Sequence, residues 1–170
     1  IDRVLGAALV PYPRQGYPAL GLVIYQIDGG SLKGFRLPEI VLDQERNVGR
    51  EELAGPPGLE GRYQITLSEN PFGAPYYAGY VEIEPHGDAY RVRWYTPRLA
   101  YVGTGVRLGS TFVVAYSFNQ APGVVAYCIG PDWLVGVGAN FDRETLSYQT
   151  MHRAGSPLPP WSTARPPTCS

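Results

Sequence analysis

Acidic and basic side chains alternate with apolar ones in two neighbouring segments of the chain. Glu82 and Glu84 are two residues apart, so in a strand both carboxylates point to the same face. A pair of that kind could act as the acid and the nucleophile of a glycoside hydrolase. Arg91 and Arg93 follow in the next segment, where a simple antiparallel hairpin would place Arg91 opposite Glu82. We therefore predict a structural ion pair between Glu82 and Arg91 instead of a catalytic pair.

The histidines and cysteines give little support for metal or nucleophilic chemistry. His86 falls in a predicted turn and His152 just beyond the last predicted strand. Cys128 and Cys169 lack C-x-x-C spacing and have no histidine cluster nearby, so they predict one disulfide, with two free thiols as the alternative. Closing a loop of that length contributes roughly 4 kcal/mol in the chain-entropy model and indicates an oxidising compartment.

Other catalytic motifs are missing from the sequence. It contains no G-x-S-x-G elbow, no phosphate-binding glycine loop and no H-E-x-x-H pair. Asp43 and Glu45 could gather with Glu51 and Glu52 around calcium if their loops had the right geometry. We predict no catalytic residue, no cofactor and no metal site.

Composition narrows the class of protein. The chain has 170 residues, with 14 basic and 15 acidic side chains and a formal charge of −1, which argues against nucleic acid or an anionic membrane as partner. Its apolar runs are far shorter than the roughly 20 residues of a membrane helix, so we predict no membrane insertion. The 21 glycines, 17 prolines and 13 tyrosines suit many short strands joined by tight turns.

Apolar and polar residues alternate with period two through most of the chain. Tyr63, Ile65 and Leu67 alternate with polar neighbours, which is typical of a half-buried strand. Further strands are predicted at 80–84, 90–94, 101–108, 111–118, 123–129, 133–138 and 145–151. Turn signals recur about every eight to twelve residues, and no helical stripe is found. The predicted fold is all-β, an antiparallel up-and-down barrel or sandwich of about eight strands.

The most informative feature is an internal repeat with an offset of about 102 residues. The segment 19–27 matches 121–129, and 32–34 matches 134–136. Residues 5–10 fall against 108–113, and Glu51-Glu52-Leu53 against Glu144-Thr145-Leu146. The order of segments is the same throughout.

The repeat divides the chain into three parts. Residues 1–54 form an N-terminal half-repeat of about four strands, 59–151 a complete repeat domain, and 155–170 an extended tail rich in Pro, Ser and Thr. The first copy therefore lacks the partners of its strands, and unpaired edges are costly. Either the two pieces merge within the chain, or the missing half comes from a neighbouring molecule.

The complete copy resembles a repeat of exported bacterial proteins of unassigned function. The resemblance rests on Gly61-Arg62-Tyr63, Asn70-Pro71-Phe72-Gly73, the segment 77–83, the segment 87–94 and Gly103-Thr104-Gly105. It covers most of 59–136 and, through the repeat, 19–53. It implies export to the cell surface or medium and an all-β fold, and it carries no catalytic or binding residues. The chain begins at Ile1 without a signal peptide, as a processed form would.

Aromatic residues divide into two groups. Inward positions on the predicted strands indicate core, with a pocket for a small apolar ligand as the alternative; they are Tyr90, Trp94, Tyr101, Phe112, Tyr116 and Tyr127. Positions in Pro-rich or turn segments form a candidate contact surface for another protein; they are Tyr12, Tyr17, Tyr76, Tyr77 and Trp161.

These observations favour a non-enzymatic extracellular structural or adhesive protein. We expect it to assemble with copies of itself by β-strand complementation through its truncated repeat. The alternative is a monomeric barrel that binds a small apolar ligand or a host protein. An enzyme with an unfamiliar site, a hydrolase if anything, is the third hypothesis.

Overall fold

Every regular element that the structure describes is a β-strand. The computed structural model describes residues 6–8, 20–37, 48–70, 72–97, 100–118, 121–140, 142 and 144–155. Its strands are β1 (Gly6–Ala8), β2 (Gly21–Asp28), β3 (Ser31–Leu37), β4 (Gly49–Ala54), β5 (Gly61–Glu69), β6 (Tyr80–His86), β7 (Ala89–Tyr95), β8 (Ala100–Leu108), β9 (Thr111–Ser117), β10 (Val124–Ile129), β11 (Trp133–Ala139) and β12 (Ser147–His152). Within these residues no helix is long and apolar enough to cross a membrane.

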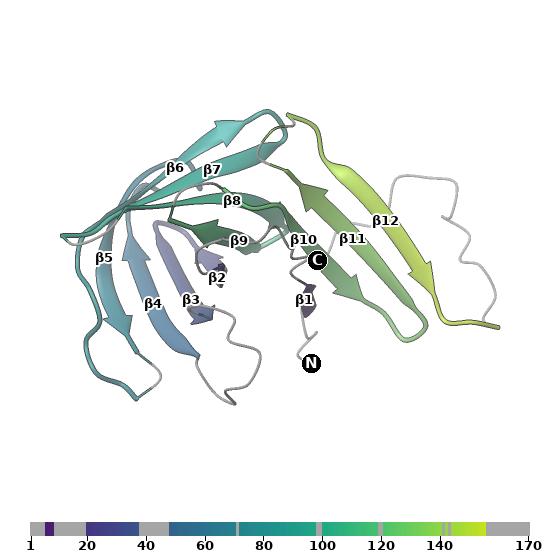
Figure 1. Cartoon of the computed structure of the whole chain (residues 1–170), viewed down its shortest axis with the longest axis horizontal. Coiled ribbons are helices and arrows are strands. Elements are labelled where there is room, and N and C mark those ends of the chain that lie inside the picture. The colour runs from purple at the N-terminus through teal and green to yellow at the C-terminus, as the bar shows by residue number, and fades with distance from the viewer. Residues whose placement is uncertain are drawn as a thin grey trace.

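Eight consecutive strands close into an antiparallel barrel (Figure 1). β2 to β9 pair in chain order, and the pairing of β2 with β9 closes the ring, with Tyr25 opposite Phe112. The all-β fold is thus confirmed, and of the two predicted architectures the structure has the closed antiparallel barrel, although its eight strands are not the eight predicted in 59–151. The last five predicted strands match β8 to β12 to within two residues at each end.

Period-two alternation fills the barrel with apolar side chains. On β6, Val81 and Ile83 are buried in the interior, whereas Glu82 between them lies on the other face. Strands all around the barrel supply one interior cluster in this way. Its buried members are Val23, Tyr25, Leu32, Leu53, Leu59, Tyr63, Ile65, Val81, Ile83, Val92, Trp94, Phe112, Val114 and Tyr116.

The remaining strands form a second sheet in the order β1-β10-β11-β12. It packs against the outside of the barrel, where a second apolar cluster joins Leu22, Val113 and Ala115 of the barrel to Ala126 and Val137 of the sheet. β9 is therefore buried on both faces, in agreement with its run of apolar residues. Figure 1 shows β10, β11 and β12 to the right of the barrel, with β12 outermost.

The predicted domain 59–151 is divided between these two sheets. Its first five strands, β5 to β9, join β2 to β4 of the N-terminal half-repeat to make the barrel. Its last three strands, β10 to β12, lie in the second sheet beside β1. The two pieces of the repeat merge within the chain, but the merger leaves the end of the second copy outside the barrel.

The register of the β6–β7 hairpin differs from the predicted register by two residues. Glu82 lies opposite Arg93, two residues from the expected Arg91, which lies opposite Glu84. The loop is a two-residue turn instead of the predicted four, because His86 pairs with Ala89 directly. A shift of two residues keeps each side chain on its predicted face. An ion pair on this hairpin joins Arg93 and Glu84, 2.7 Å apart, and the pair of Glu82 with Arg91 stays a prediction.

A β-bulge changes the inward face of β5. The pairing shifts between Glu52 and Leu53, so that Leu67 lies opposite the former and Ile65 opposite the latter. Beyond this irregularity Ser68 is buried and Leu67 is only half-buried. The simple alternation of Tyr63, Ile65 and Leu67 therefore ends at Ile65, since an extra residue reverses the two faces.

Two glycine substitutions test the packing of the barrel wall. A Cβ at Gly34 would lie 2.6 Å from the Tyr25 ring and 2.7 Å from the carbonyl oxygen of Ile24. Gly34→Ala should lower the free energy of unfolding by about 1–3 kcal/mol, because the barrel must shift to admit the methyl group. The matched control is Gly58→Ala, since a Cβ at Gly58 would meet nothing within 4 Å, and we expect a change within about 0.5 kcal/mol. Urea unfolding measures both variants; equal stabilities would contradict the packing described.

Candidate functional site

A buried carboxylate forms the polar centre of the barrel. Glu51, on β4, has no exposed surface and lies between two apolar inward positions on alternate residues. It accepts hydrogen bonds from the hydroxyl groups of Tyr25 and Tyr77 and from the Trp94 indole, whose Nε1 lies 3.1 Å from Oε1. Donors from three different parts of the barrel thus converge on one side chain, so the cost of burying it is offset by hydrogen bonds.

Burial controls the protonation of this centre. Loss of solvation raises the pKa of Glu51, while the hydrogen bonds from Tyr25 and Trp94 and the charge of Arg36 act in the opposite direction. Burial, together with the neighbouring Glu51 carboxylate, also raises the pKa of the Tyr25 hydroxyl well above its ordinary value. A proton is therefore held more firmly in the folded barrel than in the unfolded chain.

Arg36 lies among tyrosine rings beside this centre. Its guanidinium carbon is 4.7 Å from the ring centres of both Tyr76 and Tyr77 and 5.8 Å from that of Tyr116. Its Nη1 donates to the Tyr77 hydroxyl at 3.0 Å. The Tyr116 hydroxyl is buried without a hydrogen-bond partner among the described residues. These contacts hold the segment before β6 against the barrel.

The centre is better suited to structure than to catalysis. A general acid or base must come within hydrogen-bond reach of a substrate. Glu51 is enclosed and already accepts three hydrogen bonds from the barrel's own side chains. We conclude that this network fixes β4, β7 and the Tyr77 segment relative to one another.

The second sheet repeats the core of this arrangement. In the barrel Tyr25 pairs with Gly34, and in the second sheet Tyr127 pairs with Gly136; both members lie 102 residues later. Each tyrosine ring covers its glycine, since a Cβ on either glycine would lie 2.6 Å from the ring.

The neighbouring strands continue the parallel. Gly34 lies opposite Glu51, and Gly136 opposite Gln149. The Tyr127 hydroxyl donates to Oε1 of Gln149 at 2.9 Å, as the Tyr25 hydroxyl does to Glu51. Gln149 is therefore the counterpart of Glu51. The predicted match of Glu51 with Glu144 is corrected by five residues, because the loop before β12 is shorter than the loop before β4 by less than that match requires.

The two tyrosines belong to matching rows of side chains that differ in burial. In the barrel the row is Val23, Tyr25, Ile27, Leu32, Glu51 and Leu53, of which all but the half-buried Ile27 are buried. In the second sheet the row is Val125, Tyr127, Ile129, Leu134, Gln149 and Met151. We call the face formed by this second row the open face. It points away from the seam with the barrel, because the seam uses the alternate residues Val124, Ala126 and Cys128.

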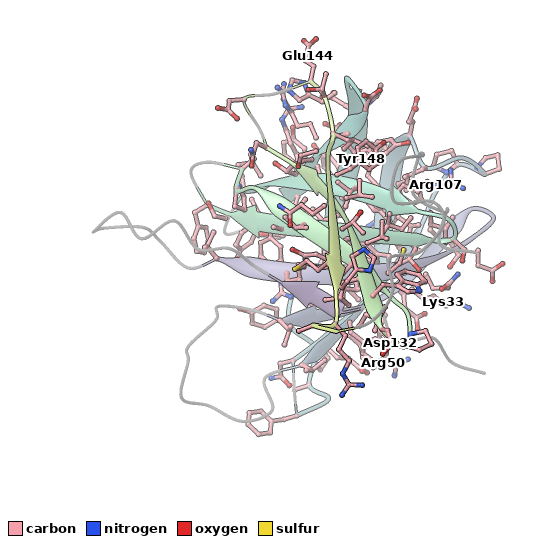
Figure 2. All side chains as sticks on the ribbon, turned by 90° about the vertical axis from the view of Figure 1, so that its right-hand side faces the viewer. Lys33, Arg50, Arg107, Asp132, Glu144 and Tyr148 are labelled. Atoms are coloured by element: carbon pink, nitrogen blue, oxygen red, sulfur yellow. The ribbon has the colours of Figure 1, made fainter. Side chains whose placement is uncertain are left out.

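The open face and its outer strand are not covered by any described strand. Ile129 and Met151 are each 42% exposed, and Gln149 is exposed as well. β12 pairs only with β11, so its other edge is unpaired within the described residues. In Figure 2, β12 is the strand nearest the viewer, with Tyr148 labelled along it. An unpaired edge beside exposed apolar side chains is a surface suited to strand addition.

The residues predicted as a contact surface are only partly described. Tyr12, Tyr17 and Trp161 lie outside the described residues. Tyr76 is 52% exposed, whereas Tyr77 packs against the interior cluster and donates to Glu51.

The residues considered for metal and thiol chemistry are only partly described. Asp43 and Glu45 lie outside the described residues, and Glu52 is on the outer face, 3.2 Å from Arg50. No group of three or more His, Cys, Asp or Glu side chains able to hold a metal occurs in the described part of the chain. Cys128 lies on β10, but Cys169 is outside the described residues, so their disulfide stays a prediction.

Sequence reasoning missed the roles of Glu51 and Arg36. The sequence predicts Glu51 only as a member of the repeat and a possible calcium ligand, although its position between the inward residues Gly49 and Leu53 already places it on the interior face. Comparison with models of protein families, with curated proteins and with solved structures found no match. The site must therefore be interpreted from its own geometry.

The pH dependence of stability tests the buried centre. A carboxyl group whose pKa is raised on folding stabilises the fold fully below its unfolded value near 4.5, and that contribution is lost as pH rises through the folded pKa. Glu51→Gln cannot ionise, so above pH 4.5 its unfolding free energy should fall less steeply with pH than that of the wild type, whose slope from one such group reaches at most about 1.4 kcal/mol per pH unit. Urea unfolding at several pH values measures the difference. Parallel profiles would show that Glu51 is not buried as described.

Proposed function

We propose that this protein is a non-enzymatic, extracellular structural or adhesive protein that assembles by β-strand complementation through its second sheet. Its partners are chains that carry the same repeat, copies of itself in the first place. The observation that carries this proposal is the open face. Its side chains match those of the barrel interior in type and register, yet the described structure leaves them uncovered.

The charges of the chain are compatible with assembly. The open face carries no ionised side chain, and Gln149 takes the place that Glu51 has in the barrel. Covering such a face requires no desolvation of a charge, which is the costly step at an interface. The formal charge of −1 gives little repulsion between copies.

The alternative, a monomeric barrel that binds a small ligand, has one observation in its favour. The hydroxyl of Tyr116 is buried without a described partner and could bond a polar group of a ligand. The same ring packs on Trp94 and Tyr101, at centre distances of 5.2 and 5.5 Å. These aromatic contacts, and the saturated centre around Glu51, favour an interior that serves as core.

The predicted disulfide tests the extracellular part of the proposal. Thiol titration of the unfolded protein purified without reductant should detect no free thiol, and two after reduction. Replacing both Cys128 and Cys169 by serine should lower the free energy of unfolding by roughly 4 kcal/mol, because the unfolded chain regains the entropy of an open loop. Two reactive thiols in the protein as isolated from an oxidising compartment would contradict the pairing.

Charges placed on the open face test the assembly. The wild-type chain should show a mass by light scattering that rises with concentration. The double substitution Gln149→Lys with Met151→Lys should weaken association at least about 100-fold, because burying unpaired charges costs several kcal/mol.

The matched control for this test is Thr150→Lys. It lies on the same strand but on the opposite face, so association should persist. A wild-type chain that stays monomeric across the whole concentration range would overturn self-assembly. Loss of association in the control would place the interface elsewhere.

A further inference from the structure

We infer that the open face is built to receive four antiparallel strands equivalent to β5–β8 of the same repeat, delivered by a partner chain, so that the second sheet closes as a second eight-stranded barrel. This inference rests on the proposed assembly function and specifies the part of the partner that is bound. We call residues 55–108, which carry β5 to β8, the front half.

Strand order provides the first step. Within the barrel, four neighbouring strands follow the order β9-β2-β3-β4, and the second sheet follows β1-β10-β11-β12. Strands β2 and β3 match β10 and β11 in sequence, and β12 takes the place of β4. β1 lies beside β10 as β9 lies beside β2, although Tyr127 pairs with Gly6 and not with Leu9, the predicted counterpart of Phe112. What separates β9 from β4 around the rest of the barrel is β5–β8. The second sheet therefore lacks the equivalents of these four strands.

Register provides the second step. The hairpins β2–β3 and β10–β11 have the same register, because Tyr25 opposite Gly34 corresponds to Tyr127 opposite Gly136. A slip of one residue would turn every side chain to the other face. The outer strand is also placed alike, since Leu53 pairs with Leu32 and Met151 with Leu134.

Contacts in the barrel show what the front half would supply. There Leu53 lies opposite Ile65 of β5, and Glu51 receives Trp94 of β7 and Tyr77 of the segment before β6. Neither β7 nor that segment has a counterpart in the second sheet. A front half docked in the same way would place an apolar partner opposite Met151. It would also bring an indole N–H to the amide oxygen of Gln149 and a tyrosine hydroxyl able to accept from its Nε2.

Counting the sets of back strands and the front halves in one chain indicates which chain must supply the front half for the open face. The described residues hold two sets of back strands, β2–β4 and β10–β12, but one front half, which already closes its own barrel. If two identical chains exchanged their front halves, the number of closed barrels would stay the same. Such an exchange therefore gives no net stabilisation. A partner chain with an unpaired front half of the repeat adds a closed barrel. The occupant is therefore this partner, and contact between two open faces of identical copies is the weaker use of the same surface.

A fusion of the full chain with its own front half tests the fit. A copy of residues 55–108 is placed before Ile1 through a flexible linker, so that it precedes β1 as β8 precedes β9. In the barrel Arg50 lies opposite Glu69, with their side chains 3.6 Å apart, and the β12 counterpart of Arg50 is Tyr148. Cysteine at Tyr148 and at Glu69 of the added copy should then cross-link, because directly paired residues satisfy disulfide geometry.

The control moves one cysteine out of register. Tyr148→Cys with Leu67→Cys in the added copy keeps the face but shifts the pairing by two residues, beyond the reach of a disulfide. The in-register fusion should cross-link at least about tenfold faster. Hydrogen exchange of the β12 amides should slow at least about 100-fold in the fusion without added cysteines, and its self-association should be lost.

A second control addresses the fit of the inward side chains. Val81→Asp with Ile83→Asp in the added copy alone should abolish both the cross-link and the protection of β12. Equal cross-linking in and out of register, or closure in spite of these charges, would overturn the inference. Self-association of the wild type that Gln149→Lys with Met151→Lys abolishes would then still support the proposed function. A monomeric wild type together with a closed fusion would overturn self-assembly while supporting the front half as occupant.

Discussion

In a closed barrel both edges of every strand must be paired with a neighbouring strand, and the architecture of this chain depends on that requirement. β5 and β9 are the two outer strands of the five that follow residue 59, and each needs a neighbour. Two sets of strands in this chain have the right pattern to serve, β2–β4 and β10–β12. Only one set can occupy the place, so the other is excluded from the barrel whatever its own affinity for it.

Side chains explain why the N-terminal set occupies the barrel. Arg36 stacks on tyrosine rings that include Tyr77, and Glu51 accepts the indole of Trp94. The corresponding positions in the second set are Gly138 and Gln149. A glycine cannot make the stacking contact with the tyrosines, and an amide accepts a weaker hydrogen bond than a carboxylate does. The N-terminal set therefore makes the more favourable contacts with the front half of this chain.

The alternation of side chains could be predicted from sequence, but the exchange of strands could not. Val81 and Ile83 are inward as their spacing predicts, and the match of Tyr25 with Tyr127 is real in three dimensions. The register of the β6–β7 hairpin depended on the length of its turn, which the sequence Pro85-His86-Gly87-Asp88 leaves open.

Pairings between strands far apart in the sequence were even harder to predict. The shared Glu-x-Leu pattern matches Glu144 with Glu51, since loops of unequal length before β4 and β12 leave the alignment open. Only the pairing with Gly136 identifies Gln149 instead. Which copy closes the barrel depends on a competition between two similar sets of strands. Differences at a few side chains decide that competition. Neither the period of apolar residues nor the match between the repeats indicates how much these differences contribute to stability.

The second sheet differs from its barrel counterpart in a coordinated way. Arg36 and the ionisable carboxyl group of Glu51 lie near each other in the barrel, where the charge of Arg36 lowers the pKa of Glu51 against the larger effect of burial. Gly138 and Gln149 remove both charges together, so neither is left without its partner. An unpaired carboxylate on the open face would resist being covered, because its desolvation would not be offset. The neutral amide of Gln149 already accepts a hydrogen bond from Tyr127. Its two N–H donors are left for an incoming strand, and the face can be buried without burying a charge. The replacement of both charges thus makes the open face more suitable for a partner than a second copy of the charged pair would be.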